Sequence, residues 1–502
     1  MPYAPAANLP RRGVVDLGSN SVRLVVYEGD SRNPMPIFNE KAVLRLGLGL
    51  QATGRLNEDG VARALMVMRR YYLIAKAMGA DPFEVLATAA VRDATNGPDF
   101  VARLQARMPE VPIRILSGQE EAAYSADGVL CGIPDADGIL ADIGGGSLEV
   151  VRLIRGERGV SQTLALGVIR LADRSSGNLD TARDKAEADL ATVPWLKDGA
   201  ERDLYLVGGA WRALARIQIA REMYPLQIVH NYRVSADAAR DLTNLIAASS
   251  VRALERMPGA PKRRLEDLPY AAIALRRLLR VTGAKRVVFS ATGLREGWFM
   301  RHMPATIRSQ DPLLSASQEM ARRLGRDPAL PESLFAWTTP LFPRETTDEQ
   351  QLRRAACWVS DIGSHDHPEY RAEQSFLRVF WQPGIGLDHP TRAFLGLAVA
   401  LRYEVDADAA FLTPARKLLD AQAIARAEML GKALRLAYTL SAGTPDLLGG
   451  TNLRMQGGRL ILRLEEDHGV FAGDAVTRRL TRLAQAIGLE ADTETALPRA
   501  AE

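Results

Sequence analysis

The sequence predicts a mixed α/β protein in which two related hairpins face each other across a cleft, followed by a helical region. The first observation is a repeat: residues 15–26 and 141–151 each hold an apolar strand, an aspartate, a turn of small residues and a second apolar strand. The second is the alternation of strands with amphipathic helices before Ser309, which is typical of α/β layers. The third is the region after Ser309, which is rich in Leu, Ala and Arg and has the hydrophobic periodicity of helices.

Composition limits the class of protein. The chain has 502 residues, which is enough for several domains, and its 47% hydrophobic and 25% charged residues are ordinary for a globular protein. A formal charge of +4 permits a polyanionic partner without requiring one. Cys131 and Cys357 are far apart, which argues against a disulfide scaffold and fits a reducing cytoplasm. Residues 1–12 lack the apolar core of a signal peptide, and no apolar run is long enough to span a membrane.

The elements of the first α/β part follow from apolar runs and caps. We expect two strands around the first turn, over residues 13–27, and a third strand over 41–46. Asn57 is suited to cap a helix over residues 57–78, and Gly79 is suited to end it. A buried strand is then expected over residues 84–89, a helix over 98–108 and a strand over 112–116. A capping box within residues 117–121 begins the next helix.

The second part begins with the repeated hairpin at Gly138 and continues in the same style. Apolar runs predict strands at residues 159–165, 203–207 and 286–290, and helical periodicity predicts helices at 236–247 and 268–281, before a turn and helix at 291–297. Residues from about 310 to 440 are predicted to be all helical. A last small α/β unit follows Gly443, with a strand over 458–464 and a helix over 474–487.

The repeated turns are the first candidates for chemistry. Asp16 and Asp142 each follow a strand and precede a glycine turn, and such a pair suits a hard cation that bridges carboxylate and phosphate oxygens. The competing interpretation is that each aspartate only shapes its turn. Small residues let backbone N–H groups close around an anion, although an ordinary hairpin turn uses them too. The anion-binding candidates in the turns are Ser19, Asn20, Gly144, Gly145, Gly146 and Ser147.

Two acids stand at the start of the helix that follows Ser117. Glu120 has capping-box spacing from Ser117, which gives it a structural role and leaves Glu121 without one. A carboxylate at the edge of a cleft can orient and deprotonate water for hydrolysis of a phosphoanhydride. The competing interpretation is that Glu121 complements the dipole of the first helical turn.

Arginines are the natural bidentate partners of phosphate oxygens. Arg92 is the favoured candidate because its neighbours are apolar and its charge needs a partner, whereas Arg23, Arg170 and Arg295 have weaker claims against a solvated surface role. Gly208 and Gly209 join a strand to a helix, which predicts either an anion site at the helix N-terminus or close helix–strand packing. Basic residues are also dense from Arg252 to Arg286, either for a polyphosphate or nucleic acid or as solvated helix faces.

Taken together, these segments resemble the exopolyphosphatase / guanosine pentaphosphate phosphatase family. The likeness lies in residues 16–21, 87–92, 117–122, 142–147 and 293–297, whose order and spacing agree across roughly residues 13–300. It implies two actin-like (ribonuclease H-like) domains with a Mg²⁺-dependent site in the cleft between them. We therefore expect an actin-like domain I over 1–126, an actin-like domain II over 127–308, a helical HD-like domain over 309–440 and a small C-terminal domain over 441–502.

By position, the resemblance implies that Glu121 is the catalytic base and that Asp142 belongs to the metal site. The expected metal set is Asp16, Asp142 and Glu149. The expected phosphate-binding set is Ser19, Asn20, Arg23, Arg92, Gly144, Gly145, Gly146, Ser147, Gly208, Gly209 and Arg295.

In the helical domain, Ser360 replaces the histidine of the His-Asp motif that longer family members carry, so we expect this domain to bind or dimerise rather than catalyse. His365, His367 and His389 lie nearby and are expected to be surface or cap histidines.

The function predicted first is Mg²⁺-dependent exopolyphosphatase activity in the cytoplasm, by a homodimer that requires neither membrane nor nucleic acid. The alternative is hydrolysis of guanosine pentaphosphate (pppGpp) to ppGpp by the same chemistry. A lesser alternative is a kinase-like or chaperone-like ATP binder. Against it stands Trp211, whose ring is predicted to occupy the place where such a kinase seats adenosine. A non-catalytic polyanion sensor is disfavoured because the acids of the site look complete.

Overall fold

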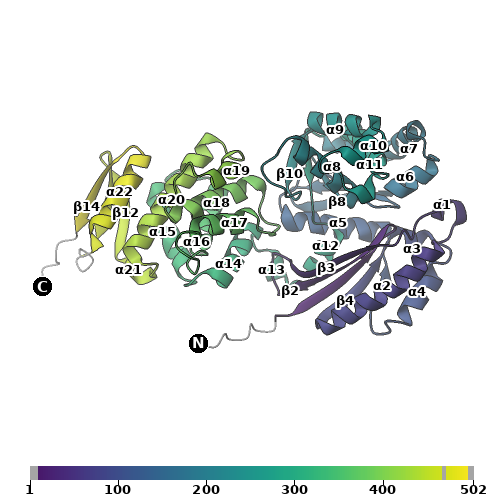
Figure 1. Ribbon diagram of the computed structural model, residues 1–502, viewed down its shortest axis with the longest axis horizontal. Helices are drawn as coiled ribbons and strands as arrows, with labels where there is room; N and C mark the ends of the chain where they lie inside the picture. The colour runs from purple at the N-terminus through teal and green to yellow at the C-terminus, as the bar shows by residue number, and fades with distance from the viewer. Residues whose placement is uncertain (1–8, 466–470, 496–502) are drawn as a thin grey trace. The chain divides into compact units, whose positions relative to one another are not determined.

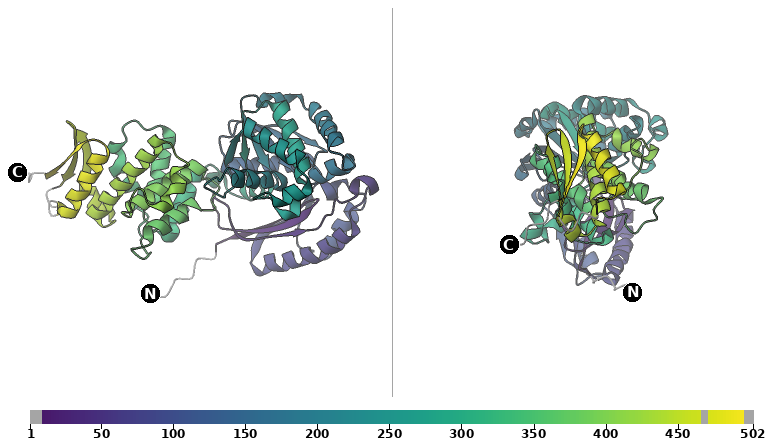
Figure 2. Two further views of the ribbon diagram at one scale, coloured as in Figure 1. Left: turned by 45° about the horizontal axis from the view of Figure 1, so that its top comes forward. Right: turned by 90° about the vertical axis from the view of Figure 1, so that its left-hand side faces the viewer.

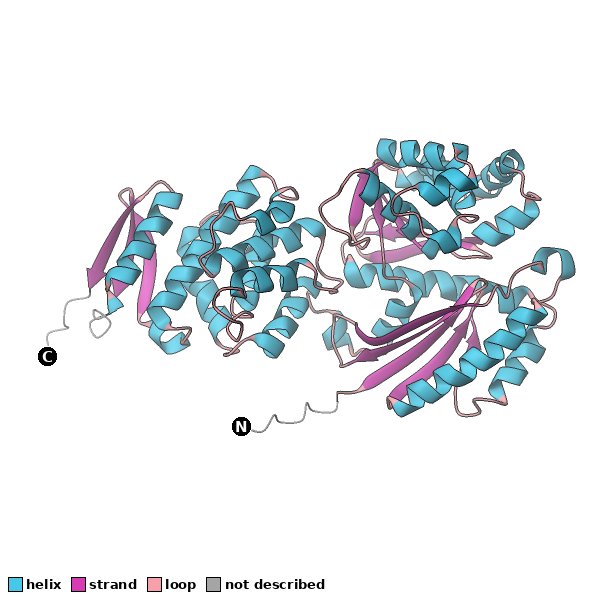
Figure 3. Ribbon diagram, viewed as in Figure 1, coloured by secondary structure: helices cyan, strands magenta, loops and turns pink. Residues whose placement is uncertain are grey.

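The computed structural model describes residues 9–465 and 471–495, and the chain forms two compact units, Met1–Ser309 and Gln310–Glu502. The first unit contains two mixed sheets covered by helices, and the second is mainly helical (Figure 3). The mixed α/β character and the helical region are as predicted. The predicted boundary between residues 126 and 127 falls inside one unbroken helix, α5 (Gly118–Gly132).

The first sheet is built around the first glycine turn. Its five strands have the order β3-β2-β1-β4-β5. β1 runs antiparallel to β2 and parallel to β4, and helices α2 and α4 lie on one face of the sheet (Figure 1). The elements are β1 (Arg11–Leu17), β2 (Ser21–Glu28), β3 (Met35–Val43), α1 (Leu50–Thr53), α2 (Glu58–Ala77), β4 (Ala80–Ala87), α3 (Ala89–Asp93), α4 (Gly97–Gln105) and β5 (Ile113–Ile115).

The second sheet repeats this topology around the second glycine turn. Its order is β10-β11-β9-β6-β7-β8, so β6, β7, β8, β9 and β11 correspond to the five strands of the first sheet, and β10 is an added edge strand. The strands are β6 (Gly138–Ile143), β7 (Leu148–Ile154), β8 (Glu157–Leu164), β9 (Asp203–Val207), β10 (Tyr232–Ser235) and β11 (Arg286–Phe289). The helices are α6 (Val168–Arg174), α7 (Leu179–Ala191), α8 (Gly209–Arg221), α9 (Ala236–Ala248), α10 (Val251–Arg256), α11 (Leu268–Thr282), α12 (Leu294–Arg301) and α13 (Ala305–Arg308).

Two predicted strands of the first sheet are displaced. β4 begins four residues before the expected strand 84–89, and β3 covers Met35–Val43 in place of the expected 41–46. β3 ends at Val43 because the chain then turns back to bind the first glycine turn. The N–H groups of Leu44 and Arg45 both donate to the Asn20 carbonyl at 2.9 Å, and Gly47 donates to the Ser19 carbonyl at 2.9 Å. A strand cannot continue through residues whose N–H groups are used in this way, so residues 44–46 leave the sheet.

Two helices join the sheets. Helix α5 packs on β7 and β8 of the second sheet, helix α12 packs on β1 of the first, and the two helices pack on each other (Figure 1). Figure 2 shows the same unit from two further directions. Their backbones touch through glycine: a methyl group on Gly297 would lie 1.9 Å from the Tyr124 carbonyl oxygen, and one on Gly128 would lie 1.9 Å from the Gly293 carbonyl oxygen. This contact fixes the two sheets, and the turns they carry, relative to each other.

The second unit is a helical bundle that ends in a small sheet. Three strands of order β12-β13-β14 carry α22 on one side, and the predicted strand and helix of this region are confirmed as β13 and α22. In the part of the chain that the structure describes, no helix is long and apolar enough to cross a membrane. The elements are α14 (Pro312–Leu324), α15 (Leu330–Thr338), α16 (Thr347–Val359), α17 (Arg371–Phe380), α18 (His389–Arg402), α19 (Thr413–Arg416), α20 (Ala421–Ser441), α21 (Pro445–Gly449), β12 (Thr451–Gln456), β13 (Arg459–Leu464), α22 (Asp474–Ala486) and β14 (Glu490–Thr495). Short 3₁₀ turns are η1 (Pro194–Gly199), η2 (Lys262–Arg264), η3 (Thr339–Leu341) and η4 (Ala410–Leu412).

The glycine contact between α5 and α12 makes a testable prediction about stability. We expect Gly297→Ala to lower the free energy of unfolding by about 1–3 kcal/mol, because the added methyl group overpacks a contact between two backbones. The measurement is the midpoint of thermal or urea unfolding. The control is Gly449→Ala in helix α21, where a methyl group meets no atom within 4 Å. An unchanged midpoint for Gly297→Ala would contradict the assigned role of this contact.

Candidate active site

The two glycine turns face each other at the bottom of one cleft. In each turn the hairpin is closed in the same way: Gly18 donates its N–H to the Ser21 carbonyl at 3.1 Å, and Gly144 donates to the Ser147 carbonyl at 3.0 Å. A methyl group on Gly145 would lie 3.1 Å from Ser19 Cβ, and one on Gly146 would lie 3.0 Å from Ser19 Oγ. A side chain at residue 145 or 146 would therefore require Ser19 of the opposite turn to shift by a few tenths of an ångström.

In both turns the carbonyl groups are held from behind, away from the cleft. Residues 44–47 bind the carbonyls of the first turn, as described above. In the second turn Ile169 and Arg170 donate to the Gly145 carbonyl at 3.0 and 3.1 Å. The backbone N–H groups of Asn20, Gly145 and Gly146 have no acceptor among the described residues. Backbone N–H groups that converge without an acceptor form a binding site for an anion.

Carboxylates line the same cleft beside the turns. Asp16 stands at the end of β1 and Asp142 at the end of β6, so the repeat places the two aspartates at equivalent positions of the two sheets, and both line the cleft. Burial raises the pKa of both, against the lowering effect of Arg295. Arg295 Nε lies 3.9 Å from Asp16 Oδ2, and Ser125 Oγ donates to Asp142 Oδ2.

Glu121 enters the cleft from the first turn of α5. The capping box predicted at Ser117 and Glu120 is confirmed, and it fixes the start of this helix. Burial and the nearby Asp142 and Asp16 raise the pKa of Glu121 to about 8, although Arg92 opposes them by donating from Nη1 to Glu121 Oε2 at 3.2 Å. A carboxylate with this pKa is suited to accept a proton near neutral pH.

Glu149 is buried behind the cleft and does not line it. It is the cross-strand neighbour of Asp142, and its Oε1 atom is buried with no hydrogen-bond partner. Burial and the charges of Glu121 and Asp142 raise its pKa well above the ordinary value. Burial raises the pKa values of four carboxyl groups in this region, those of Asp16, Glu121, Asp142 and Glu149, and neighbouring carboxylates of the group add to the rise for the last three.

This group of acids fits a divalent cation. No group of three or more His, Cys, Asp or Glu side chains converges as a metal site among the described residues, so protein ligands alone would not complete a coordination shell. Mg²⁺ commonly binds through one or two carboxylates and takes its other ligands from phosphate and water. The carboxyl-lined cleft and the orphaned Glu149 Oε1 suit such a partly protein-bound cation.

Basic side chains form the rest of the cleft wall. The sequence predicts two of these side chains, Arg23 and Arg295, as phosphate-binding residues. It does not single out Lys41 or Arg212, and it includes Arg264 only in the basic stretch from Arg252 to Arg286. Arg23, Lys41 and Arg212 have no ion-pair partner among the residues that the structure describes. Burial, together with Arg264, Arg23 and Arg212, lowers the pKa of Lys41 to about 8, and burial and Arg295 lower that of Arg212 to about 10. Cations that lower each other's pKa values without a counter-ion indicate a polyanionic ligand.

The turn at Gly208 and Gly209 lies in the cleft wall, but Trp211 does not. The Trp211 ring is fully buried and donates from Nε1 to the Ala271 carbonyl at 3.0 Å, so the prediction that it fills an adenosine site is wrong. Its ring lies in the apolar core and faces helix α11, which contains Ala271. The guanidinium of Arg264 covers this turn instead, with Nη2 2.5 Å from a methyl group placed on Gly209.

Arg92 and the far part of the basic stretch lie outside the cleft. Arg92 reaches Glu121 from the other side and also donates to the Leu116 carbonyl at 2.9 Å. Arg276 and Arg277 line a separate recess with Arg183 on helices α7, α9 and α11. Arg170 pairs with Asp93, beside the second turn.

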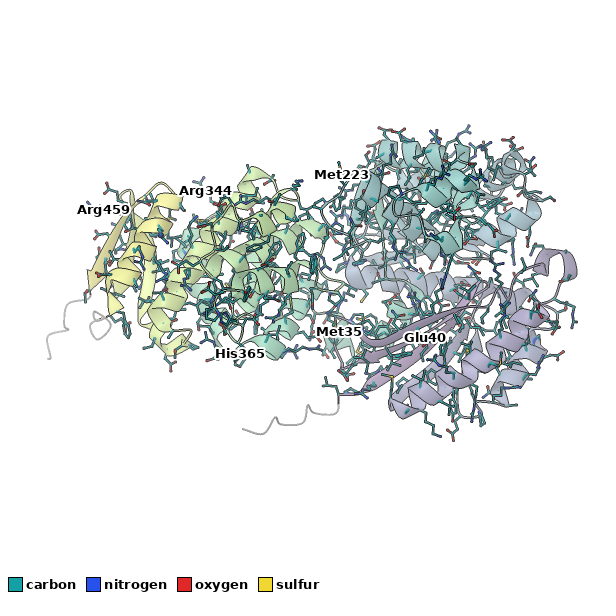
Figure 4. All side chains as sticks on the ribbon, in the orientation of Figure 1. Met35, Glu40, Met223, Arg344, His365 and Arg459 are labelled. Carbon is teal, nitrogen blue, oxygen red and sulfur yellow. The ribbon has the colours of Figure 1, made fainter. Side chains whose placement is uncertain are left out.

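Among the described residues of the helical unit, no metal site forms around the replaced motif. Ser360 is buried and donates to the Cys357 carbonyl at 2.7 Å. Asp361 is bound by Arg326 and Arg402, and although burial opposes it, the hydrogen bonds from Arg326 and Ser364 hold its pKa below the ordinary value. His365 is exposed at the surface of this unit (Figure 4), His367 is exposed too, and His389 is buried in the first turn of α18.

Comparison with known proteins agrees with this arrangement. The family model described as Ppx/GppA phosphatase family matches residues 25–306, and that described as Exopolyphosphatase, C-terminal matches residues 313–493. Exopolyphosphatase 1 of Mycobacterium tuberculosis is 27% identical over 332 residues, which cover 64% of this chain and 96% of the relative. Retrograde regulation protein 2 of Saccharomyces cerevisiae is 24% identical over 437 residues, which cover 78% and 72%.

A solved structure shares the fold of the first unit. The crystal structure of an exopolyphosphatase from Cytophaga hutchinsonii superposes with a TM-score of 0.53 at 22% identity, over 57% of this chain and 96% of that one. The matched residues 25–306 make up more than half of the chain and contain the second glycine turn, Glu121 and four cations of the cleft, Lys41, Arg212, Arg264 and Arg295. The chain therefore belongs to the Ppx/GppA phosphatase family.

Proposed function

We propose that this phosphoanhydride hydrolase is an exopolyphosphatase, which removes the terminal phosphate from inorganic polyphosphate with Mg²⁺. The observation that carries the proposal is Glu121, a buried carboxylate with a pKa of about 8 that opens into a cleft between two anion-binding turns. The N–H groups of the turns bind oxygens of the terminal phosphoryl group. The unpaired cations Arg23, Lys41 and Arg212 hold the phosphates that follow.

In the reaction, Glu121 accepts a proton from a water molecule that attacks the terminal phosphorus. The water oxygen forms a bond to phosphorus, and the bond from phosphorus to the bridging oxygen breaks, which releases orthophosphate and a chain shorter by one unit. Arg92 keeps Glu121 in place and favours its charged form. The N–H groups of the turns stabilise charge on the phosphoryl oxygens, and their fixed positions require no reorganisation during the step.

Asp16 and Asp142 would hold the Mg²⁺ ion, and Glu149 would add negative charge behind them. When bound, the ion neutralises charge on the phosphoryl oxygens.

The lining of the cleft favours inorganic polyphosphate over a nucleotide. Among the described residues that line it, none has an aromatic ring, and the apolar members are small or aliphatic, such as Ala89, Ile143 and Val168. A guanine base would find no stacking surface there, whereas a chain of phosphates would meet a cation or a backbone N–H group along the wall.

The role of Glu121 is tested by Glu121→Gln. We expect the rate of phosphate release to fall about 10²–10⁴-fold, because the amide cannot accept the proton, while binding of polyphosphate is kept. The measurements are phosphate release and binding of a labelled polyphosphate. The matched control is Glu120→Gln, which alters the neighbouring, half-exposed acid of the capping box and is expected to affect stability more than turnover. Near-normal turnover of Glu121→Gln would refute the assignment.

The pH dependence tests the contact with Arg92. Positive Arg92 lowers the pKa of Glu121, so Arg92→Gln raises that pKa and requires a higher pH for the base to be deprotonated. We expect the acid limb of kcat/KM to move up by about one pH unit or more, with a lower maximum. Arg114→Gln is the control, since Arg114 pairs with Glu120 at 3.0 Å and not with Glu121. If the acid limb of the kcat/KM profile does not move in Arg92→Gln, the Arg92–Glu121 pair does not set the protonation of the base.

Substrate and metal are tested in one assay. We expect orthophosphate to be released from long polyphosphate at least about tenfold faster than from pppGpp, a difference of about 1.4 kcal/mol in transition-state binding. Removal of Mg²⁺ with a chelator is expected to abolish release from both, and added Mg²⁺ to restore it. Equal or faster release from pppGpp would favour the nucleotide as substrate, and full activity with the chelator would remove Mg²⁺ from the proposal.

A further inference from the structure

A polar recess lies on the side of Arg92 that faces away from the cleft. It has a volume of about 320 Å³ and lies between the N-terminus of α5 and strand β8. Arg92 lines this recess and not the cleft, whereas Glu121 lines the cleft and not the recess. The Arg92–Glu121 pair, 3.2 Å apart, is therefore the partition between the two spaces. The recess is lined by Arg92, Ser117, Gly118, Gln119, Ser161, Gln162 and Thr163.

A row of polar residues crosses the sheet from the cleft to the recess. Asp142 of β6 is paired with Glu149 of β7, and Glu149 is paired with Thr163 of β8. Asp142 lines the cleft, Thr163 lines the recess, and Glu149 between them has a buried oxygen with no hydrogen-bond partner. The wall between the two spaces is thus polar along this row and not closed by an apolar layer.

The recess has the chemistry of a site for a small oxyanion. Apart from the Arg92 guanidinium, its lining side chains are hydroxyls and amides, and no carboxylate is among the described residues that line it. Ser117 is used by the capping box. The side chains of Gln119, Ser161 and Thr163 make no hydrogen bond to any other described residue, so they can donate to a ligand.

We propose that the recess is the route by which orthophosphate leaves the enzyme, past Arg92, while the shortened polyphosphate stays in the cleft. This rests on the proposed function, in which Arg23, Lys41 and Arg212 hold the remaining chain at the front. The released phosphate then lies between that chain and Glu121, and its way to the front is blocked by a polyanion of the same sign. Toward the recess the phosphate also meets the carboxyl groups of Glu121 and Glu149. Arg92, which pairs with Glu121 at 3.2 Å, supplies the counter-charge on that side when this pair opens.

The test narrows the recess without touching the cleft. The variant is Ser161→Trp, whose indole would fill the rim on β8. Its controls are Ser161→Ala and Val160→Trp, the latter at an exposed position that does not line the recess. Chemical quench of a single turnover of long polyphosphate measures total phosphate formed, and a fluorescent phosphate sensor measures phosphate set free. We expect Ser161→Trp to form phosphate at a rate within twofold of the unmodified protein and to release it at least tenfold more slowly, with a burst of bound phosphate.

The other outcomes are equally informative. If folded Ser161→Trp releases phosphate as fast as it forms it, the proposal is overturned. The proposal is also overturned if this variant forms less phosphate and holds none bound, because the recess would then be a route for water. If Ser161→Trp does not fold, Ser161→Cys is treated after folding with a bulky maleimide, since Cys131 and Cys357 are both buried. If the unmodified protein forms no phosphate from polyphosphate, the proposed function fails instead of the exit route.

Discussion

The close approach of two backbone turns is the constraint on which the rest of the structure depends. The space between them is tight at Gly145 and Gly146, where a methyl group would lie 3.1 Å from Ser19 Cβ and 3.0 Å from Ser19 Oγ of the opposite turn. Each turn has its carbonyls bound from behind by a different segment, residues 44–47 for one and the start of α6 for the other. The backbone N–H groups of Asn20, Gly145 and Gly146 have no acceptor among the described residues, so they are left to bind an anion.

The two turns can stay this close only if the two sheets that carry them are held in fixed positions, and glycine residues make this possible too. The two sheets are joined by α5 and α12, whose backbones meet at Gly128, Gly293 and Gly297. Helix α5 carries Glu121 and helix α12 carries Arg295, so the same packing that orients the sheets also places an acid and a cation at the cleft. The position of the turns and the position of the Glu121 carboxyl group are consequences of one helix pair.

Buried acids and cations lie side by side in the cleft of the first unit. Burial raises the pKa values of Asp16, Asp142 and Glu149. Arg23 is the cross-strand neighbour of Asp16, and Arg295 Nε lies 3.9 Å from Asp16 Oδ2. Like charges repel each other in a desolvated space. The polyanion and the divalent cation proposed above would offset the acids and the cations at once.

The sequence by itself determined the features that depend on neighbours a few residues apart. Apolar periodicity and capping residues correctly predict the two hairpins, the caps at Asn57 and Ser117, and most helices and strands. Glu121 stands out from the sequence because its neighbour Glu120 forms the capping box with Ser117. Only the tertiary structure decided which distant side chains converge. Lys41, Arg212 and Arg264 come from three separate elements and meet only in the folded cleft. Strand β3 ends at Val43 because the next residues bind the first glycine turn, and Trp211 is buried in the core. Long-range packing and burial set these positions, and no local pattern encodes them.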